Sequence, residues 1–126
     1  MLSWQTQNGF KIEMELIERR CHVTFSGALD WTQDSDLITQ CFNQVWTNTD
    51  IKCLLLDCRD LSFANRDGVL GTYFLALILE IKTQAREKHL RLFICLKSKK
   101  QAAILNLWGD GMWRKFKRHF IFDDPD

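Results

Sequence analysis

The stretch LLLDCRDLSFANRDGVLGTYFLALI, residues 54–78, decides the fold that this sequence predicts. It continues the apolar run IKCLLLDC (51–58), which is typical of a central strand buried on both faces. The loop RDLSF (59–63) and a short turn follow, and an apolar helix is predicted over residues 67–87. A strand that leads through a turn into a long helix is typical of α/β domains.

Hydrophobic periodicity predicts the elements before this stretch. FKIEMELI (10–17) and CHVTFSG (21–27) alternate apolar and polar residues, so they predict two half-exposed strands joined as a hairpin. A helix is predicted from about 33 to 47, with Asp34 or Ser35 as its cap. Its apolar stripe consists of Leu37, Ile38, Cys41, Phe42, Val45 and Trp46.

The carboxyl-terminal part adds a strand, a helix and a final short strand. HLRLFICL (89–96) predicts a buried strand, Ser98 is a good cap for a helix over 98–108, and a last strand is expected at 119–122. The order is ββαβαβα(β), an α/β fold with a mixed sheet of four to five strands and helices packed on it. Because no linker interrupts the chain, residues 10–124 are expected to form one domain after a loose polar lead-in at 1–9.

Charge and composition argue against nucleic acid and a membrane span. Lysine and arginine number 17 against 16 aspartates and glutamates, so the formal net charge is only +1. The longest apolar stretch, GVLGTYFLALIL (68–79), is shorter than the ~20 residues that a membrane span needs. No secretion signal is visible at the amino terminus, so a cytoplasmic protein is expected.

The sequence predicts neither a metal site, nor a cofactor, nor an enzyme. The five cysteines lack CxxC spacing and are expected to be buried, reduced thiols, and the three histidines lack metal-ligand spacing. There is no P-loop and no nucleophile–base or paired-carboxylate constellation. Asp57 is predicted to hold backbone N–H groups of the following loop.

The quoted stretch resembles the STAS family, the domains of sulphate transporters and anti-sigma-factor antagonists. The resemblance covers residues 10–124 and rests on Asp57 at the end of a buried strand, the DLSF loop (60–63) and Gly68. In that family an Asp-Ser-Ser-Gly turn opens the second helix, and its second serine is phosphorylated by a kinase-type anti-sigma factor, which weakens binding. Here the three positions before the glycine are Asn65, Arg66 and Asp67.

Asp67 therefore stands where the family has its phosphoacceptor serine, and it has no hydroxyl to phosphorylate. A negative group in the first turn of a helix is stabilised by roughly 0.3–1 kcal/mol, because the first N–H groups are unpaired and the helix dipole is positive there. Two interpretations remain open. Asp67 is either a fixed imitation of the phosphorylated state or a good first-turn residue.

The resemblance also implies a partner-binding face on the second helix and its preceding turn. The predicted core stripe of this helix consists of Leu70, Phe74, Leu77, Ile78 and Ile81. Leu75 and Leu79 lie away from it, so they are either part of the partner-binding face or packed under a neighbouring helix. The candidate partner-binding residues are Asn65, Arg66, Asp67, Gly68, Val69, Thr72, Leu75, Ala76 and Leu79. The basic segments 97–100 and 114–119 are either solvated faces or contacts for an acidic partner.

Two functions are expected from the resemblance. The first is a non-catalytic regulatory module like an anti-sigma-factor antagonist, which switches between partners of the anti-sigma, serine-kinase type and so regulates transcription. The second is a STAS adaptor or scaffold subunit of a transport or stress-sensing complex. Whether the chain forms a homodimer is left open.

Overall fold

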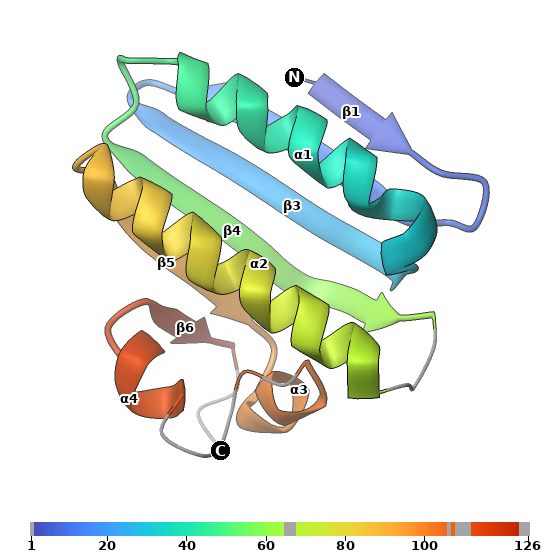
Figure 1. Cartoon of the computed structure of the whole chain (residues 1–126). Helices are drawn as coiled ribbons and strands as arrows, with labels where there is room; N and C mark the ends of the chain where they lie inside the picture. Colours follow the sequence, from blue (N-terminus) through green and yellow to red (C-terminus); the bar gives the residue numbers. More distant parts are fainter. Residues whose placement is uncertain (1, 65–67, 106, 108–111, 124–126) are drawn as a thin grey trace.

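The computed structural model describes residues 2–64, 68–105, 107 and 112–123. A single mixed sheet carries two long helices, α1 and α2, and two short ones (Figure 1). The strands are β1 (Leu2–Gln5), β2 (Lys11–Ile17), β3 (Arg20–Leu29), β4 (Cys53–Phe63), β5 (Arg91–Leu96) and β6 (Phe120–Phe122). The helices are α1 (Trp31–Thr47), α2 (Gly68–Glu87), α3 (Lys99–Ile104) and α4 (Met112–Phe116).

The six strands of the described chain lie in sequence order across the sheet. β1, β2 and β3 are antiparallel, and β3, β4, β5 and β6 are parallel. The mixed α/β fold is confirmed, but the sheet has six strands where the sequence predicts four to five. The additional strand is β1, which pairs Leu2 with Met14 and Trp4 with Ile12 inside the expected loose lead-in. Four residues are too few for periodicity to reveal a strand.

β4 is longer than predicted and is buried on one face only. Residues 59–63 were predicted as a loop, yet they continue the strand, because β3 also extends and pairs Gly27 with Leu61 and Leu29 with Phe63. This pairing outweighs the weak strand preference of the charged residues Arg59 and Asp60. Burial alternates along β4, so the prediction of a strand buried on both faces is wrong.

Helix α1 begins earlier than the sequence predicts. Asp30 is its cap and accepts a hydrogen bond from the N–H of Thr32 at 3.1 Å, so neither Asp34 nor Ser35 caps the helix. Asp34 instead lies fully buried in the first turn, where its Oδ2 accepts the N–H of Asp30 at 2.8 Å. This bond satisfies one of the donors that a helix start leaves unpaired.

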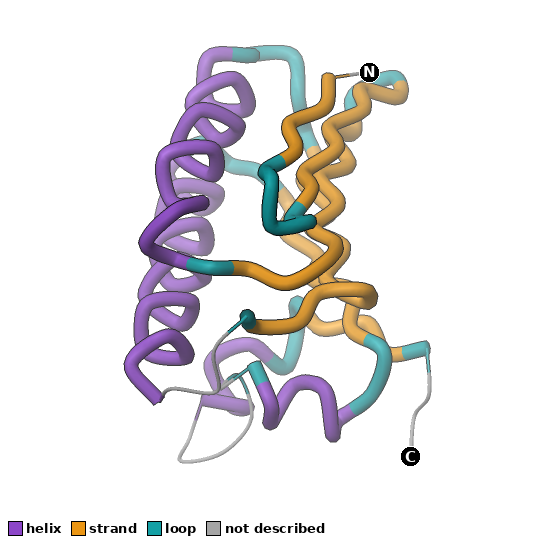
Figure 2. The backbone as a smooth tube through the Cα atoms, turned by 90° about the vertical axis from the view of Figure 1, so that its right-hand side faces the viewer, coloured by secondary structure: helices purple, strands orange, loops and turns teal. Residues whose placement is uncertain are grey.

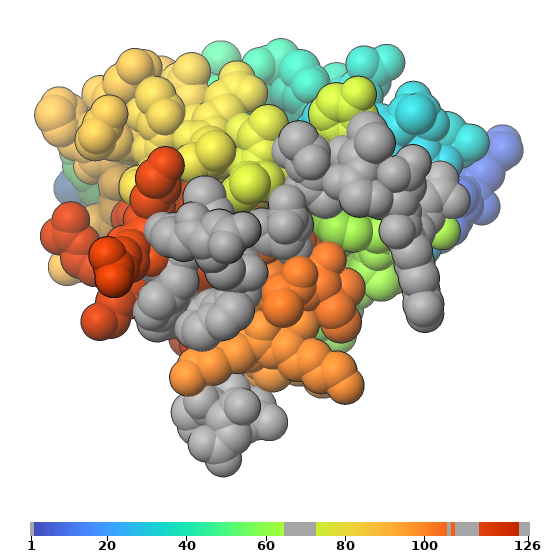
Figure 3. All heavy atoms as spheres, turned by 60° about the horizontal axis from the view of Figure 1, so that its bottom comes forward, coloured from blue at the N-terminus to red at the C-terminus, as the bar shows by residue number. Residues whose placement is uncertain are grey.

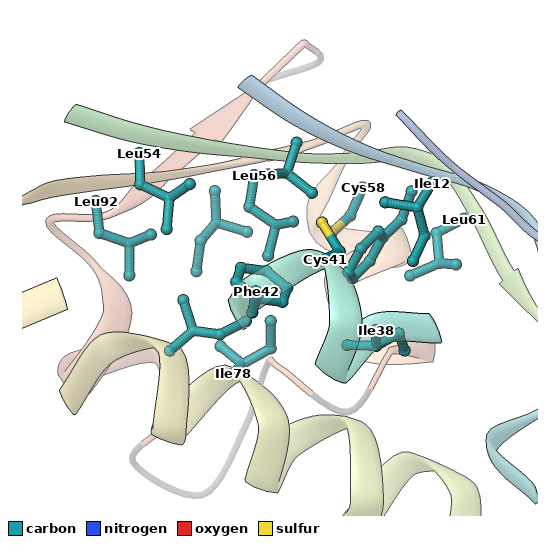
Figure 4. Close-up of a cluster of buried hydrophobic side chains, with 14 of the residues drawn as sticks. Ile12, Ile38, Cys41, Phe42, Leu54, Leu56, Cys58, Leu61, Ile78 and Leu92 are labelled. Atoms are coloured by element: carbon teal, nitrogen blue, oxygen red, sulfur yellow. The ribbon is translucent and has the colours of Figure 1, made fainter. Parts of the chain in front are cut away.

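Both long helices lie on the same side of the sheet (Figure 2). The helix predicted over residues 67–87 is present as α2 from Gly68 to Glu87, with Phe74 and Ile78 buried, and buried Ile38 and Phe42 confirm the apolar stripe of α1. Figure 4 shows side chains of α1, α2, β2, β4 and β5 meeting between the sheet and the helices. The core therefore fills one face of the sheet, as helical and strand periodicities together require.

The short helix α3 has the predicted cap but ends early. The Ser98 hydroxyl accepts the N–H of Gln101 at 3.2 Å, and the helix stops at Ile104 where the sequence predicts residue 108. No helix in the described part of the chain has the length and apolar character that crossing a bilayer requires. All five cysteines are free thiols, of which Cys53 and Cys95 are half-buried and the others buried.

Candidate protein-docking site

The end of β4 that leads into α2 is held by side chains from two directions. The N–H of Arg59 donates to Asp57 Oδ1 at 3.0 Å, which confirms that Asp57 holds a backbone N–H, and the guanidinium of Arg59 lies 2.8 Å from Asp57 Oδ2. From α3, Gln101 Nε2 donates to the carbonyls of Cys58, Arg59 and Leu61 at 2.7, 2.9 and 3.3 Å. These bonds fix the backbone of β4 from Cys58 to Leu61.

Ion pairs of Arg59 with two carboxylates add to the hydrogen bonds at this end of β4. Burial acts to raise the pKa of Asp57, but the hydrogen bonds and charge of Arg59 outweigh it, so the pKa of this carboxyl is lowered. Asp57 in turn raises the pKa of Arg59, which also pairs with Asp123 at 3.3 Å. No cluster of three or more metal-ligating side chains occurs among the described residues.

The predicted partner-binding residues fall into three groups. Asn65, Arg66 and Asp67 lie outside the described residues. Gly68, Val69 and Thr72 belong to the first turns of α2. Leu75, Ala76 and Leu79 follow in the same helix, where Ala76 is exposed and the two leucines are half-buried and packed against the core.

Leu75 and Leu79 lie on the side of α2 that faces α4. Lys82 shares this side, because it follows Leu75 by seven residues and Leu79 by three. Its Nζ donates to the carbonyl of Lys115 at 2.9 Å and lies 5.3 Å from the ring centroid of Phe116. In Figure 3 the atoms of α4 lie beside those of α2 on this surface. The two leucines are half-buried against the core on the side of α2 from which Lys82 reaches α4, and their part in partner binding stays a prediction.

The opposite side of α2 borders a groove that the sequence did not reveal. The groove has a volume of about 220 Å³ and lies between α1 and α2. Its lining is mostly apolar and aromatic, with polar groups at the mouth: Trp31, Ser35, Ile38, Thr39, Phe42, Asn43, Trp46, Tyr73, Ala76, Leu77, Glu80 and Ile81. Of the predicted binding residues whose side chains the structure describes, Ala76 lines the groove, and Leu75 and Leu79 do not.

Two aromatic rings close one end of this groove. Trp31 stacks on Tyr73 with ring centroids 5.8 Å apart and an interplanar angle of 14°, which joins the start of α1 to α2. Tyr73 remains 46% exposed. Half-buried Trp31 and Trp46 and exposed Tyr73 are the signal that the sequence offered, since aromatic residues are enriched at protein interfaces.

Comparison with known proteins identifies the fold. No family model matches the sequence, and no curated protein matches it either. Among solved structures, the chain is similar to the anti-sigma factor antagonist SpoIIAA in its unphosphorylated form, with a TM-score of 0.60 and 12% sequence identity. The match covers 90% of this chain and 88% of SpoIIAA. The chain therefore has the STAS-like fold that its sequence predicts.

Proposed function

We propose that this chain is a non-catalytic regulatory module that binds a protein partner through α1, α2 and the turn before α2. The observation that carries the proposal is the aromatic groove between α1 and α2 on a fold shared with an anti-sigma factor antagonist. Stacked and half-exposed aromatic side chains in a groove are typical anchor points for a partner.

The partner proposed is an anti-sigma factor of the serine-kinase type, in a partner-switching pathway that regulates transcription. Asp67 then occupies the position of the phosphoacceptor serine as a permanent carboxylate. A carboxylate carries one negative charge, against about −1.5 to −2 for phosphoserine. A serine at this position would allow an unphosphorylated and a phosphorylated binding state, whereas the chain with Asp67 has one state only.

A STAS adaptor or scaffold subunit is the second candidate. The observation in its favour is again Asp67, since a chain with no hydroxyl at this position suits a complex that stays assembled. The identity of the bound protein separates the two functions. A kinase-type anti-sigma factor supports the first, and a subunit of a transport or stress-sensing complex supports the second.

Affinity capture with a matched pair of variants tests the docking surface. Ala76→Arg places a long cation in the groove, whereas Gln40→Arg adds the same charge at an exposed position of α1 that does not line it. Both substitutions are at exposed helix positions, where the folded state tolerates arginine. The expected result is loss of the partner with Ala76→Arg only. Retention of the partner by both variants would place the docking surface elsewhere.

Calorimetry on the captured partner tests Asp67. If the partner pairs an arginine or lysine with a fixed carboxylate, Asp67→Ser and Asp67→Asn should each weaken binding, by ~2–5 kcal/mol for a partly buried pair. If Asp67 imitates a phosphorylated state that releases the partner, Asp67→Ser should tighten binding. Unchanged affinity in both variants would leave Asp67 a helix-start residue and end the switch hypothesis.

A further inference from the structure

One face of the sheet is not covered by any helix of the described residues. α1 and α2 both lie on the other side, and Figure 2 shows only strands and loops on this side among the described residues. Parallel strands are usually covered on both faces. Here β3, β4 and β5 present half-buried side chains to this open face, among them His22, Leu55 and Phe93, which are register partners.

A hollow lies on the open face near the first residues of the parallel strands. It has a volume of about 520 Å³, on the scale of ligand and peptide sites. The lining residues are Arg19, Arg20, His22, Lys52, Cys53, Leu55, Arg91, Phe93 and Ile121. The hollow is on the open face, and α1 and α2 pack on the other face, so the hollow and the α1–α2 groove lie on opposite sides of the sheet.

Cationic side chains surround the hollow. Arg20, Cys53 and Arg91 are register partners across three strands, and Arg19 and Lys52 directly precede two of these positions. Burial raises the pKa of the Cys53 thiol, and the charges of Arg20 and Arg91 oppose that rise, so both cations lie near it.

Among the described residues, no carboxylate lines the hollow, and none of its four lysines and arginines forms an ion pair. The whole chain has a formal charge of only +1, so this is a local excess of positive charge. The floor, by contrast, is apolar and contains Leu55, Phe93 and Ile121.

We propose that this hollow docks an acidic segment of a partner protein that also carries apolar side chains. Neighbouring strands are ~4.8 Å apart, so Arg20 and Arg91 are separated by about two strand spacings and suit several carboxylates better than one anionic headgroup. Leu55, Phe93 and Ile121 supply the apolar contact that anchors such a segment, with the cations as its polar rim.

Two other occupants fit the surface less well. A second copy of the chain placed face to face about a twofold axis would bring Arg20 and Arg91 towards the same cations of its mate. A nucleic acid would extend past the hollow over Glu13, Glu15 and Asp57 on the same open face, which repel phosphate, whereas a short acidic segment can stay on the cations of the hollow.

Fluorescence anisotropy of the full chain with a labelled peptide tests the proposal. The probe has about ten residues, ~33 Å when extended, with glutamate alternating with leucine and phenylalanine. Binding is expected, and it should weaken as salt shortens the Debye length from ~30 Å at 0.01 M to ~3 Å at 1 M. The same peptide with glutamine or lysine at every glutamate should not bind. Absence of binding by the glutamate peptide would overturn the proposal.

Charge reversals locate the site. Arg20→Glu with Arg91→Glu should weaken binding about tenfold or more, because both cations are at the rim of the hollow. Lys97→Glu with Lys100→Glu makes the same change in net charge beyond the other end of β5 and should leave affinity nearly unchanged. Equal loss in both pairs would show attraction to overall charge and would overturn the site. Ile121→Ser, at a position 44% exposed, should also weaken binding, since it removes apolar contact without opening the core.

Parallel measurements separate the other occupants. Phosphatidylglycerol vesicles and an oligouridylate are added in place of the peptide, and sedimentation velocity follows self-association. Binding of vesicles or oligonucleotide that needs Arg20 and Arg91, without binding of the peptide, would overturn the proposal. Dimerisation of the unmodified chain that Arg20→Glu with Arg91→Glu abolishes would also overturn the proposal.

Discussion

The indole ring of Trp31 stacks on the phenol ring of Tyr73, with their centroids 5.8 Å apart. The two residues are far apart in sequence and belong to different helices, so the contact holds the start of α1 against α2. It closes one end of the groove that the proposed function assigns to a partner.

A double-mutant cycle on this ring pair should show a favourable coupling. Trp31→Ala, Tyr73→Ala and the double variant are compared by urea unfolding, and a coupling near ~0.5 kcal/mol is expected, the lower end for aromatic pairs, because Tyr73 is 46% exposed. Trp4→Ala combined with Tyr73→Ala serves as control. Trp4 lies on edge strand β1, so this second pair should be additive. Additivity in both cycles would mean that the stack contributes nothing to stability.

Gly27 should be far less replaceable than Gly9, although both have positive φ angles, of 85° and 93°. A Cβ at Gly27 would lie 2.2 Å from the carbonyl oxygen of Gly9, whereas a Cβ at Gly9 meets nothing within 4 Å. Gly9→Ala should therefore cost about 1–2 kcal/mol, the strain of a left-handed backbone, and Gly27→Ala clearly more. Thermal unfolding of the two variants measures the difference. Equal losses would show that the backbones of residues 9 and 27 separate easily.

The Asp57–Arg59 pair should make stability depend on pH in the acidic range. Because the pKa of Asp57 is lowered in the folded chain from its ordinary value of 3.8, the folded state binds fewer protons. Its stabilisation is present above pH 3.8 and is lost as the pH falls through the lowered pKa. Asp57→Asn should cost about 1 kcal/mol at neutral pH, since the pair is partly exposed, and almost nothing in strong acid.

Urea unfolding across this pH range, with Asp60→Asn as control, checks the Asp57 prediction. Asp60 is exposed on the same strand, and no ion pair joins it to another described residue. The control should follow the pH profile of the unmodified chain. A pH-independent effect of Asp57→Asn would assign the loss to the changed hydrogen bond with the Arg59 N–H and not to charge.

The five thiols should react in two classes. Burial raises the pKa of Cys21 to about 11 and that of Cys41 to about 12, and it also raises the pKa of fully buried Cys58. Cys53 and Cys95 are half-buried on the open face of the sheet, and burial raises their pKa as well. An aromatic disulfide reagent should therefore label only these two in the native chain, slowly at neutral pH and faster as the pH rises.

Labelling in urea should reach all five thiols. Cys53→Ser with Cys95→Ser should abolish labelling of the native chain and leave three reactive thiols after unfolding. Rapid native labelling of Cys41 or Cys58 would indicate that the core between the helices and the sheet opens readily.

The sequence predicted the parts of the fold that depend on local periodicity. The apolar stripe of α1, the strand–turn–helix from β4 into α2 and the Ser98 cap follow from side-chain spacing, because each helix or strand must turn one face to the core. The predicted strand boundaries were wrong where pairing with a neighbouring strand outweighed the local sequence preference. β1 and the second half of β4 exist because β2 and β3 supply hydrogen-bond partners, and pairing is not visible in a short segment.

Both candidate docking surfaces arise from contacts between distant segments. Trp31 and Tyr73 meet because α1 and α2 pack side by side on one face of the sheet. Arg20, Lys52 and Arg91 look unrelated in the sequence, and parallel pairing brings the starts of three strands together. The sequence by itself therefore determined the apolar faces of α1 and α2 and the order of the elements from β2 to α3. Only the tertiary structure decided which outward residues become neighbours, because that depends on strand register and helix packing, and no local pattern encodes either.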